Sequence, residues 1–290
     1  MSAKIIRKVT VVGVGLLGGS VGLAVKAADE RVRVVGVGRR KSSLHKALAV
    51  GAIDHATLDT AEGVADAEVV VLAAPLATYG PHMQAMGAAL ARSAVVTDVG
   101  STKSLVVRLA EKILGRGGPF VGSHPMAGGE RTGVQYARAD LFVNAVCIVT
   151  PTSRTPPARV RRVEAFWKML GAITRRMTPA AHDRAVARVS HLPHLLAALI
   201  VAGQGRGSMD LAGGGFLDTT RIASGSPAMW REIVLTNRSA MLAAIDDTDE
   251  QLMALRDMIE LGDGPGIERF LARAKKRRDQ LAANRLRRSD

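Results

Sequence analysis

The sequence predicts an α/β domain followed by an all-helical domain. Short apolar runs alternate with helical patterns up to about residue 151, which is typical of a parallel sheet with crossover helices. After residue 177 only helical patterns follow. The segment 151–160, PTSRTPPARV, has three prolines among polar residues and is the best boundary candidate. We therefore expect one domain over residues 1–151 and a second over residues 152–290.

Each apolar run of the first half has the length of a strand, and helical patterns separate the runs. The run at 67–75 is apolar on both faces, as a central strand of a parallel sheet requires. Strands are expected at 9–15, 32–40, 67–75, 93–100, 119–125 and 143–151, and helices at 18–28, 42–52, 80–91 and 102–114. In the second half, a helix at 159–171 and a short run at 172–177 precede helices at 180–203, 230–260 and 266–286.

Composition places the chain among globular proteins without disulfides. Hydrophobic residues make up 47% of the 290 residues and aromatic residues only 3%, so the cores must consist of Ala, Val, Leu and Ile. Cys147 is the only cysteine, which excludes an internal disulfide. No apolar run has the length of a membrane span, and no cleavable leader precedes the first strand. We therefore expect a cytoplasmic protein without a membrane partner.

The net charge of +14 raises the question of a polyanionic partner. The basic excess is spread over both halves, and its one dense cluster is RAKKRRDQLAANRLRRSD at 273–290. This cluster has no interleaved aromatic residues on which bases could stack. We interpret it as a solvated helix end and expect no nucleic-acid partner.

The stretch VTVVGVGLLGGS contains Gly13-x-Gly15-x-x-Gly18 between the first strand and the first helix. This context is that of a dinucleotide-binding turn. The first glycine permits the tight turn, the second lets the backbone approach a pyrophosphate, and the third lets the helix lie close to the strand. Leu16 and Leu17, at the start of the helix, belong to the same predicted site. The first domain is therefore predicted to be a Rossmann-type dinucleotide-binding domain.

The end of the second strand indicates which dinucleotide is bound. An NAD site usually has Asp or Glu about 20 residues after the glycine turn, where it binds the ribose hydroxyls. Here Gly38 stands at that position, and Arg39, Arg40 and Ser42 follow it. Guanidinium groups suit a 2′-phosphate, so the sequence favours NADP and leaves NAD open. We add Pro75, at the end of a later strand, to the predicted cofactor site.

Polar side chains at strand ends are candidates for chemistry. Ser101 follows one strand, and His124 lies at the end of the next, in VGSHPMAGGE. Ligands of doubly wound sheets bind at the carboxyl ends of the strands, so both residues are expected near the nicotinamide. A histidine with a pKa of about 6.5 suits proton transfer at neutral pH, and the alternative is a residue that caps a turn.

The helical half supplies a second polar group. The stretch HDRAVARVSHLPH contains His182, Ser190, His191 and His194, and the last two histidines lie three residues apart on one helical face. A metal site is the rival interpretation, but no cysteine partner and no H-E-x-x-H pattern accompanies them, so no metal is expected. GGGFLDTTRIASGSPAMW places Arg221 in a glycine-rich bend. A guanidinium there commonly binds a carboxylate, with a solvent-facing position as the alternative.

Five motifs resemble, in this order, the prephenate and arogenate dehydrogenase family of tyrosine biosynthesis. The resemblance covers roughly residues 5 to 275. It implies a Rossmann domain, an all-helical dimerisation domain that forms a homodimer, and an active site between them. It also implies oxidative decarboxylation of a cyclohexadienol to a phenol, with hydride transfer to NAD(P)+. The motifs are GVGLLGGS, DVGSTK, GSHPMAGGE, AHDRAVARVSHLPH and GGGFLDTTRIASGSPAMW.

The resemblance also implies roles for single residues. His124 matches the family's catalytic histidine, which hydrogen-bonds the ring hydroxyl. Ser101 matches the serine that helps to orient that hydroxyl and the nicotinamide. Ser190, His191 and His194 match residues of the family's substrate-pocket helix. Arg221 matches the arginine that binds a substrate carboxylate.

Substrate and function class stay open at this point. Some family members carry a lysine just before the DTTR-like segment, where this chain has Leu217, so prephenate and arogenate remain alternatives. A reductase of the β-hydroxyacid dehydrogenase type would usually have a catalytic lysine where this chain has histidines. A non-catalytic dinucleotide-sensing or polyanion-binding protein is supported by the basic tail alone. The family's regulatory and chorismate mutase domains are not expected, since no room remains for either.

Overall fold

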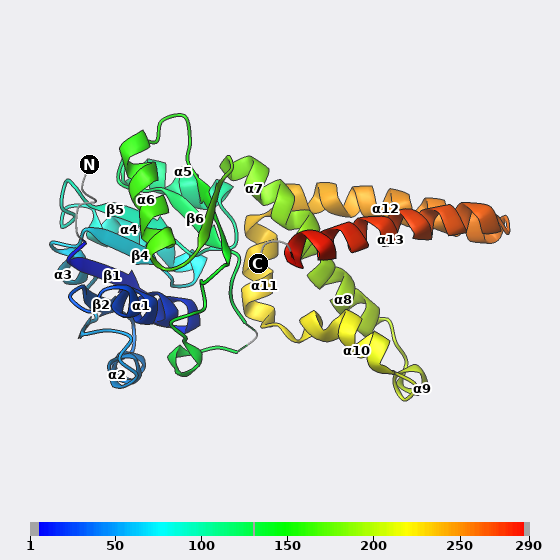
Figure 1. The fold of residues 1–290 in the computed structure, drawn as a ribbon, viewed down its shortest axis with the longest axis horizontal. Helices are drawn as coiled ribbons and strands as arrows, with labels where there is room; N and C mark the ends of the chain where they lie inside the picture. Colours follow the sequence, from blue (N-terminus) through cyan, green and yellow to red (C-terminus); the bar gives the residue numbers. More distant parts are fainter. Residues whose placement is uncertain (1–5, 130, 287–290) are drawn as a thin grey trace. The chain divides into compact units, whose positions relative to one another are not determined.

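The computed structural model describes residues 6–129 and 131–286 (Figure 1). It divides into two compact units, of which the first runs to Arg238 and the second begins at Ser239. The candidate site residues all lie in the first unit. Glu130 and the last four residues of the basic C-terminal cluster lie outside the description.

The first unit is built on a five-stranded parallel sheet in the order β3-β2-β1-β4-β5. Thr10 of β1 pairs with Val35 of β2 and with Val70 of β4, so β1 lies at the centre. This is the strand order of a Rossmann sheet, with the topological switch between β1 and β4. The predicted α/β fold is confirmed. The strands are β1 (Lys8–Val12), β2 (Arg33–Val37), β3 (His55–Thr57), β4 (Val69–Leu72) and β5 (Val95–Asp98).

Alternate side chains of the central strands face two separate cores. Val9 and Val11 of β1 lie in one core, and Val12 lies in the other. Burying one valine contributes up to about 1.5–3 kcal/mol to stability. A strand that is apolar on both faces therefore contributes to the core on each side of the sheet. The helices of this part are α1 (Leu16–Ala28), α2 (Lys41–Ala49), α3 (Thr60–Val64), α4 (Tyr79–Met86) and α5 (Ser104–Ile113), with the short 3₁₀ turns η1 (Leu76–Thr78) and η2 (Val134–Tyr136).

Three more strands extend the β structure beyond β5. Val96 of β5 forms a parallel bridge with Phe120, which immediately precedes the segment leading into β6 (Gly122–Pro125). β6 pairs antiparallel with β7 (Val146–Thr150), and β7 pairs parallel with β8 (Ile173–Arg176). His124 therefore lies inside a strand that is anchored on two sides.

The strand-bearing region continues past residue 151. Helix α6 (Pro157–Met169) carries the chain from β7 back to β8, which pairs with the open edge of β7. The predicted boundary between residues 151 and 152 falls inside this β-α-β segment. β8 has the sequence ITRR, in which basic side chains replace the apolar ones expected of a core strand.

Several short elements were not predicted, among them the helix α10 (Gly214–Thr220) in the segment expected to be a glycine-rich bend. The strand β3 has three residues and the helix α3 has five, which is too few for a periodic pattern. Asp59 begins α3 by accepting a hydrogen bond from the backbone N–H of Ala61 at 2.8 Å.

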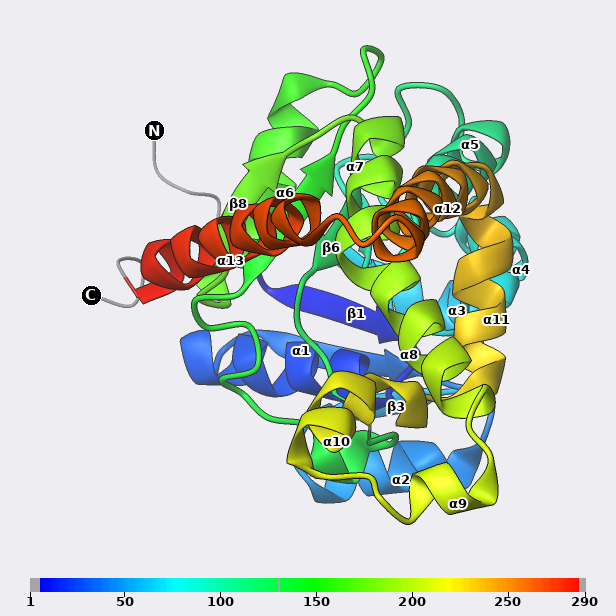
Figure 2. The same cartoon turned by 90° about the vertical axis from the view of Figure 1, so that its right-hand side faces the viewer.

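The rest of the first unit is helical, as predicted. A π-helical turn, η3 (Ala187–His191), interrupts the rod in which Figure 2 shows α7 and α8 joined end to end. Pro193 cannot donate to the carbonyl four residues earlier, and the N–H of Leu192 bonds Ala187 five residues back instead. The helices are α7 (Pro179–Val186), α8 (Leu192–Ala202), α9 (Arg206–Met209), α10 (Gly214–Thr220) and α11 (Pro227–Thr236), with the 3₁₀ turn η4 (Arg221–Ser224).

By length and composition alone, the helical run Pro179–Ala202 could cross a membrane, with a hydropathy of 1.6. The sequence analysis found no such run because Arg188 and three histidines interrupt the apolar residues. His182 and His191 in this run are buried, which places part of it in the protein core. Only 28% of its most apolar window is buried inside the structure, so a large apolar area stays open.

The second unit consists of two long helices joined by a short turn (Figure 2). These are α12 (Arg238–Glu260) and α13 (Gly264–Leu286). Gly262 lies in the turn with a φ of +67°, a value that favours glycine.

Candidate active site

A cavity of about 470 Å³ opens at the carboxyl ends of the parallel strands. Its position at the switch between β1 and β4 is where doubly wound sheets bind their ligands. Of the predicted cofactor residues, it is lined by Gly13, Gly15, Arg39, Arg40 and Pro75.

The three glycines of the motif meet three different surroundings. Gly13 has a φ of +98°, and a Cβ there would lie 2.5 Å from the backbone nitrogen of Ala74. A Cβ on Gly15 would meet no atom within 4 Å, so its backbone borders open space in the cavity. A Cβ on Gly18 would lie 1.9 Å from the carbonyl oxygen of Gly13, so only glycine lets α1 pack this close. The loop therefore fits a dinucleotide pyrophosphate at Gly15.

The cavity differs in part from the predicted set of residues. Leu16 and Leu17 lie in the first turn of α1 and do not line it, and Ser42 is replaced in the lining by Ser43. The basic side chain of Lys46 joins Arg39 and Arg40 there. Ser43 and Lys46 are three residues apart on α2, so helical spacing counted from Arg39 would have found them. The lining also includes Thr78 and His82, which are four residues apart.

His124 lies near the end of β6, where it is 9% exposed. The backbone of Ser123, the residue before it, is held from both sides. The N–H of Ser123 donates to Asp98 Oδ1 at 2.9 Å, and Lys103 Nζ donates to the Ser123 carbonyl at 2.8 Å. Asp98 and Lys103 also form an ion pair, and both side chains are fully buried. This buried pair orients the backbone that carries His124.

A chain of hydrogen bonds leads from His124 into α7. His124 Nδ1 lies 2.8 Å from His182 Nε2, and His182 Nδ1 lies 2.8 Å from Asp183 Oδ1. The two carboxylate oxygens of Asp183 accept the backbone N–H groups of Lys103 and Ser104, each at 2.8 Å. These residues begin α5, which has no cap from its own N-cap side chain. His182 belongs to the polar group predicted in the helical half, but its contact with His124 and the part played by Asp183 were not predicted.

The histidines of the π turn and α8 form a second cluster. Asn237 Nδ2 donates to the Asp183 carbonyl at 2.9 Å and lies 3.1 Å from His191 Nδ1. Since the amide donates, Nδ1 of His191 accepts, and its proton is on Nε2. His194 stacks on Trp230 with ring centroids 3.4 Å apart and an interplanar angle of 15°. The site thus contains an aromatic wall beside two histidines.

The remaining predicted residues lie in the same unit. Ser101 lies in the turn between β5 and α5, and among the described residues no hydrogen bond joins it to His124. Ser190 lies in the π turn next to His191 and is partly buried. Arg221 begins η4 on the exposed surface.

Burial keeps the histidines of the site neutral. It lowers the pKa of His124 well below its usual value, and neighbouring His182 and Lys103 lower it further. Burial also lowers the pKa of His182, and it lowers the pKa of His191 to about 4. Burial alone would raise the pKa of Asp183, but hydrogen bonds from His182 and from the start of α5 lower it, so the carboxyl is ionised. The expectation of an ordinary histidine pKa was wrong for His124.

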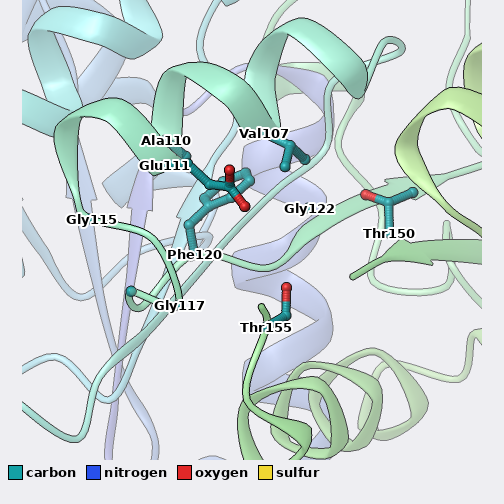
Figure 3. A pocket seen from close by; sticks show the side chains of 10 residues that line it. Val107, Ala110, Glu111, Gly115, Gly117, Phe120, Gly122, Thr150 and Thr155 are labelled. Atoms are coloured by element: carbon teal, nitrogen blue, oxygen red, sulfur yellow. The ribbon is translucent and has the colours of Figure 1, made fainter. Parts of the chain in front are cut away.

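No metal centre emerges from the described residues. In the described part of the chain, no three His, Cys, Asp or Glu side chains gather as metal ligands would. A second cavity, lined by Glu111 and Phe120 among others, has a volume of about 10 Å³ (Figure 3). It holds about one water molecule and is too small for a substrate. Thr150 Oγ1, which lines it, is the one buried side-chain oxygen or nitrogen without a partner in the described part.

Two family models match the chain. One, described as prephenate dehydrogenase, nucleotide-binding domain, matches residues 21–175, and the other, described as prephenate dehydrogenase, dimerization domain, matches residues 178–273. The chain belongs to the prephenate dehydrogenase family. The resemblance inferred from the motifs is confirmed, and the chain is an oxidoreductase that uses a nicotinamide cofactor.

Similar proteins of this family cover nearly all of the chain. Prephenate dehydrogenase of Bacillus subtilis is 36% identical over 93% of this chain and 74% of its own length. The crystal structure of prephenate dehydrogenase from A. aeolicus, in complex with hydroxyphenyl propionate and NAD+, has a TM-score of 0.90 at 32% identity. It covers 97% of this chain and 100% of that one. Synechocystis arogenate dehydrogenase has a TM-score of 0.83 at 31% identity, over 94% and 99%.

The neutral histidines predict an acid-sensitive fold. The pKa of His191 is about 4 in the folded state, against about 6.5 for an unperturbed histidine, so below pH 6.5 the unfolded chain binds a proton that the folded chain does not. The free energy of unfolding should therefore fall by roughly 3 kcal/mol between pH 6.5 and 4 from this residue alone. Urea unfolding at a series of pH values measures it.

The variant His191→Gln is the control, because glutamine cannot titrate. Its free energy of unfolding should depend less steeply on pH, by about one proton. Equal slopes for the two proteins would contradict the assignment of a neutral, buried His191.

Proposed function

We propose that this chain catalyses the oxidative decarboxylation of prephenate to 4-hydroxyphenylpyruvate, or of arogenate to tyrosine, with hydride transfer to NAD(P)+. The observation that carries the proposal is the buried, neutral His124 at the end of β6, in the same unit as the dinucleotide cavity. Two similar proteins support both substrates, since one is named a prephenate and the other an arogenate dehydrogenase.

His124 acts as the proton acceptor in this proposal. The ring carbon that bears the hydroxyl becomes carbonyl-like, so the hydroxyl must lose its proton as the reaction proceeds. A neutral imidazole can take that proton, and its depressed pKa keeps it neutral below pH 7 as well. When bound, the nicotinamide supplies the hydride acceptor. Aromatisation then drives the loss of carbon dioxide, so the proposal needs no metal.

The other site residues bind and orient the substrate. Ser101, in the turn before α5, helps to orient the ring hydroxyl, and Arg221 binds a substrate carboxylate through its guanidinium. The substrate pocket is formed by Ser190, His191 and His194, whose wall includes the ring of Trp230.

The cavity favours NADP as the cofactor. Arg39, Arg40 and Lys46 line it, and in the described part of the lining there is no carboxylate that would repel a 2′-phosphate. Gly15 would let the backbone approach the pyrophosphate at the start of α1, while Gly13 permits the turn and Gly18 the close packing of that helix. NAD remains the alternative, because the A. aeolicus complex contains NAD+.

The first experiment is nicotinamide reduction at 340 nm with prephenate or arogenate crossed with NAD or NADP. We expect turnover with at least one substrate, and a drop in kcat of ~10²–10⁴-fold in His124→Asn with unchanged dinucleotide affinity. His55→Asn, an exposed histidine on β3, is the matched control and should keep full turnover. Folded protein that binds a dinucleotide but turns over none of the four combinations would contradict the proposed function.

Cofactor preference can be tested at Gly38. A carboxylate there would repel the 2′-phosphate beside Arg39, so Gly38→Asp should lower kcat/KM for NADP by ~10-fold or more relative to NAD. The added side chain would approach Leu44 at 3.1 Å, which the flexible leucine can accommodate. Gly38→Asn has the same shape without the charge and should change the preference much less. An equal effect of the two variants would contradict a phosphate site.

We also propose a homodimer formed through helical segments. Residues 178–273 match a family model described as a dimerization domain. In the first unit Leu199 of α8 is 67% exposed, and in the second unit Leu252 is 60% and Leu261 is 82% exposed. Apolar surface of this extent is typical of an interface. Sedimentation equilibrium should give twice the chain mass of 30.5 kDa.

Leu252→Lys should weaken the dimer, because it would bury a charge in the interface. Leu58→Lys is the control, since Leu58 is exposed between β3 and α3 of the first unit. A wild-type mass of one chain at all concentrations would contradict the dimer.

A further inference from the structure

The hydrogen bonds behind His124 determine where its proton lies. They begin at Asp183, whose ionised carboxylate already accepts two backbone N–H groups at the start of α5. An ionised carboxylate can only accept hydrogen bonds. His182 Nδ1, 2.8 Å from Asp183 Oδ1, must therefore be the donor. Neutral His182 then has its proton on Nδ1 and a lone pair on Nε2.

The lone pair of His182 sets the next hydrogen bond. Its Nε2 lies 2.8 Å from His124 Nδ1, so a neutral His124 must donate from Nδ1. The proton of His124 is then on Nδ1, and its Nε2 has the free lone pair.

Nε2 of His124 is open rather than buried. In the described part of the chain it has no hydrogen-bond partner. Thr150 Oγ1 is the one fully buried side-chain nitrogen or oxygen without a partner there, so Nε2 of His124 must keep some exposure to solvent. The ring is 9% exposed in total, and Nδ1 is covered by His182. The free lone pair therefore reaches the accessible side of the ring, where a substrate hydroxyl can donate to it.

We propose that His182 and Asp183 are positioning residues that hold His124 in the Nδ1–H tautomer, with Nε2 as the proton acceptor. The inference rests on the proposed function, in which His124 takes the proton of the ring hydroxyl. In the opposite tautomer, Nε2 would already carry the ring proton and would have no lone pair with which to accept another. The relay therefore decides whether a correctly placed histidine can act as a base.

Asp183, which lies on α7 next to His182, also contacts the start of α5. It caps α5 and contacts His182 at the same time, so the start of α5 stabilises the charge that orients the histidines. Asp183 is 4% exposed and His182 is 0% exposed, so water cannot substitute for either partner.

The tautomer can be measured without substrate. The chain has seven histidines, and labelling them with ¹⁵N gives separate signals for protonated and bare ring nitrogens. The His124 signals are those absent from His124→Asn. We expect Nδ1 of His124 to be protonated and Nε2 bare in the wild type.

A pair of variants at His182 tests the effect on turnover while leaving Asp183 and its cap on α5 in place. The amide of glutamine reaches as far as Nε2 of histidine and can accept from His124, whereas that of asparagine reaches only as far as Nδ1. His182→Asn should lower kcat by ~10²–10⁴-fold, and His182→Gln should recover at least ~10-fold of that loss. Dinucleotide affinity should not change in either variant.

Two results would overturn the proposal. One is a wild-type His124 with its proton on Nε2, and the other is equal kcat values for His182→Asn and His182→Gln. If the wild type turns over neither prephenate nor arogenate, the proposed function fails, and the ¹⁵N signals still decide the tautomer by themselves.

Discussion

The carboxylate of Asp183 connects the strand-bearing part of the first unit with its helices. Taking this group out of water would be costly, and the cost is offset by three hydrogen bonds, from His182 and from the N–H groups of Lys103 and Ser104. Because those N–H groups begin α5, the same contact completes a helix end that lacks a cap of its own. Removal of this one charge would weaken the start of α5, the contact between α5 and α7, and the hydrogen bond that orients His182.

The buried pair of Asp98 and Lys103 complements that contact from the opposite side of His124. Neither side chain is exposed, so the desolvation cost of each is offset by the other, by the backbone of Ser123 and, for Asp98, also by the N–H of Gly100 at 3.0 Å. Loss of one partner would leave an unpaired buried charge, which typically costs about 3–5 kcal/mol. A hydrophobic pair could have filled the same space. The charged pair, in contrast, fixes both the N–H and the carbonyl of Ser123, which gives the neighbouring His124 a defined direction.

The sequence predicted those features that depend on local spacing. The glycine turn, His124 at a strand end and the basic residues after β2 follow from neighbours along the chain. The partnership of His124 with His182 joins residues 58 positions apart, and no local pattern encodes it. The same holds for Asn237 and Asp183, 54 positions apart. The strand β3 was not predicted, and β8 was predicted only as a short run without an assigned place in the sheet. Both form by pairing with the edge of a neighbouring strand, which leaves no periodic pattern in so few residues.

The charges of the first unit are divided between two places. Free positive charge gathers at the rim of the dinucleotide cavity, with Arg39, Arg40 and Lys46, where a phosphate can neutralise it. Around His124, in contrast, Lys103 is paired and the histidines are neutral, because a charged imidazole there would be desolvated and repelled by its neighbours. A base needs a lone pair more than a charge. Nε2 of His124 is a hydrogen-bond acceptor and Nε2 of His191 is a donor, so two neutral rings provide both functions without a buried charge. The hydrogen bonds of each Nδ1, rather than the pH, determine which ring accepts and which donates.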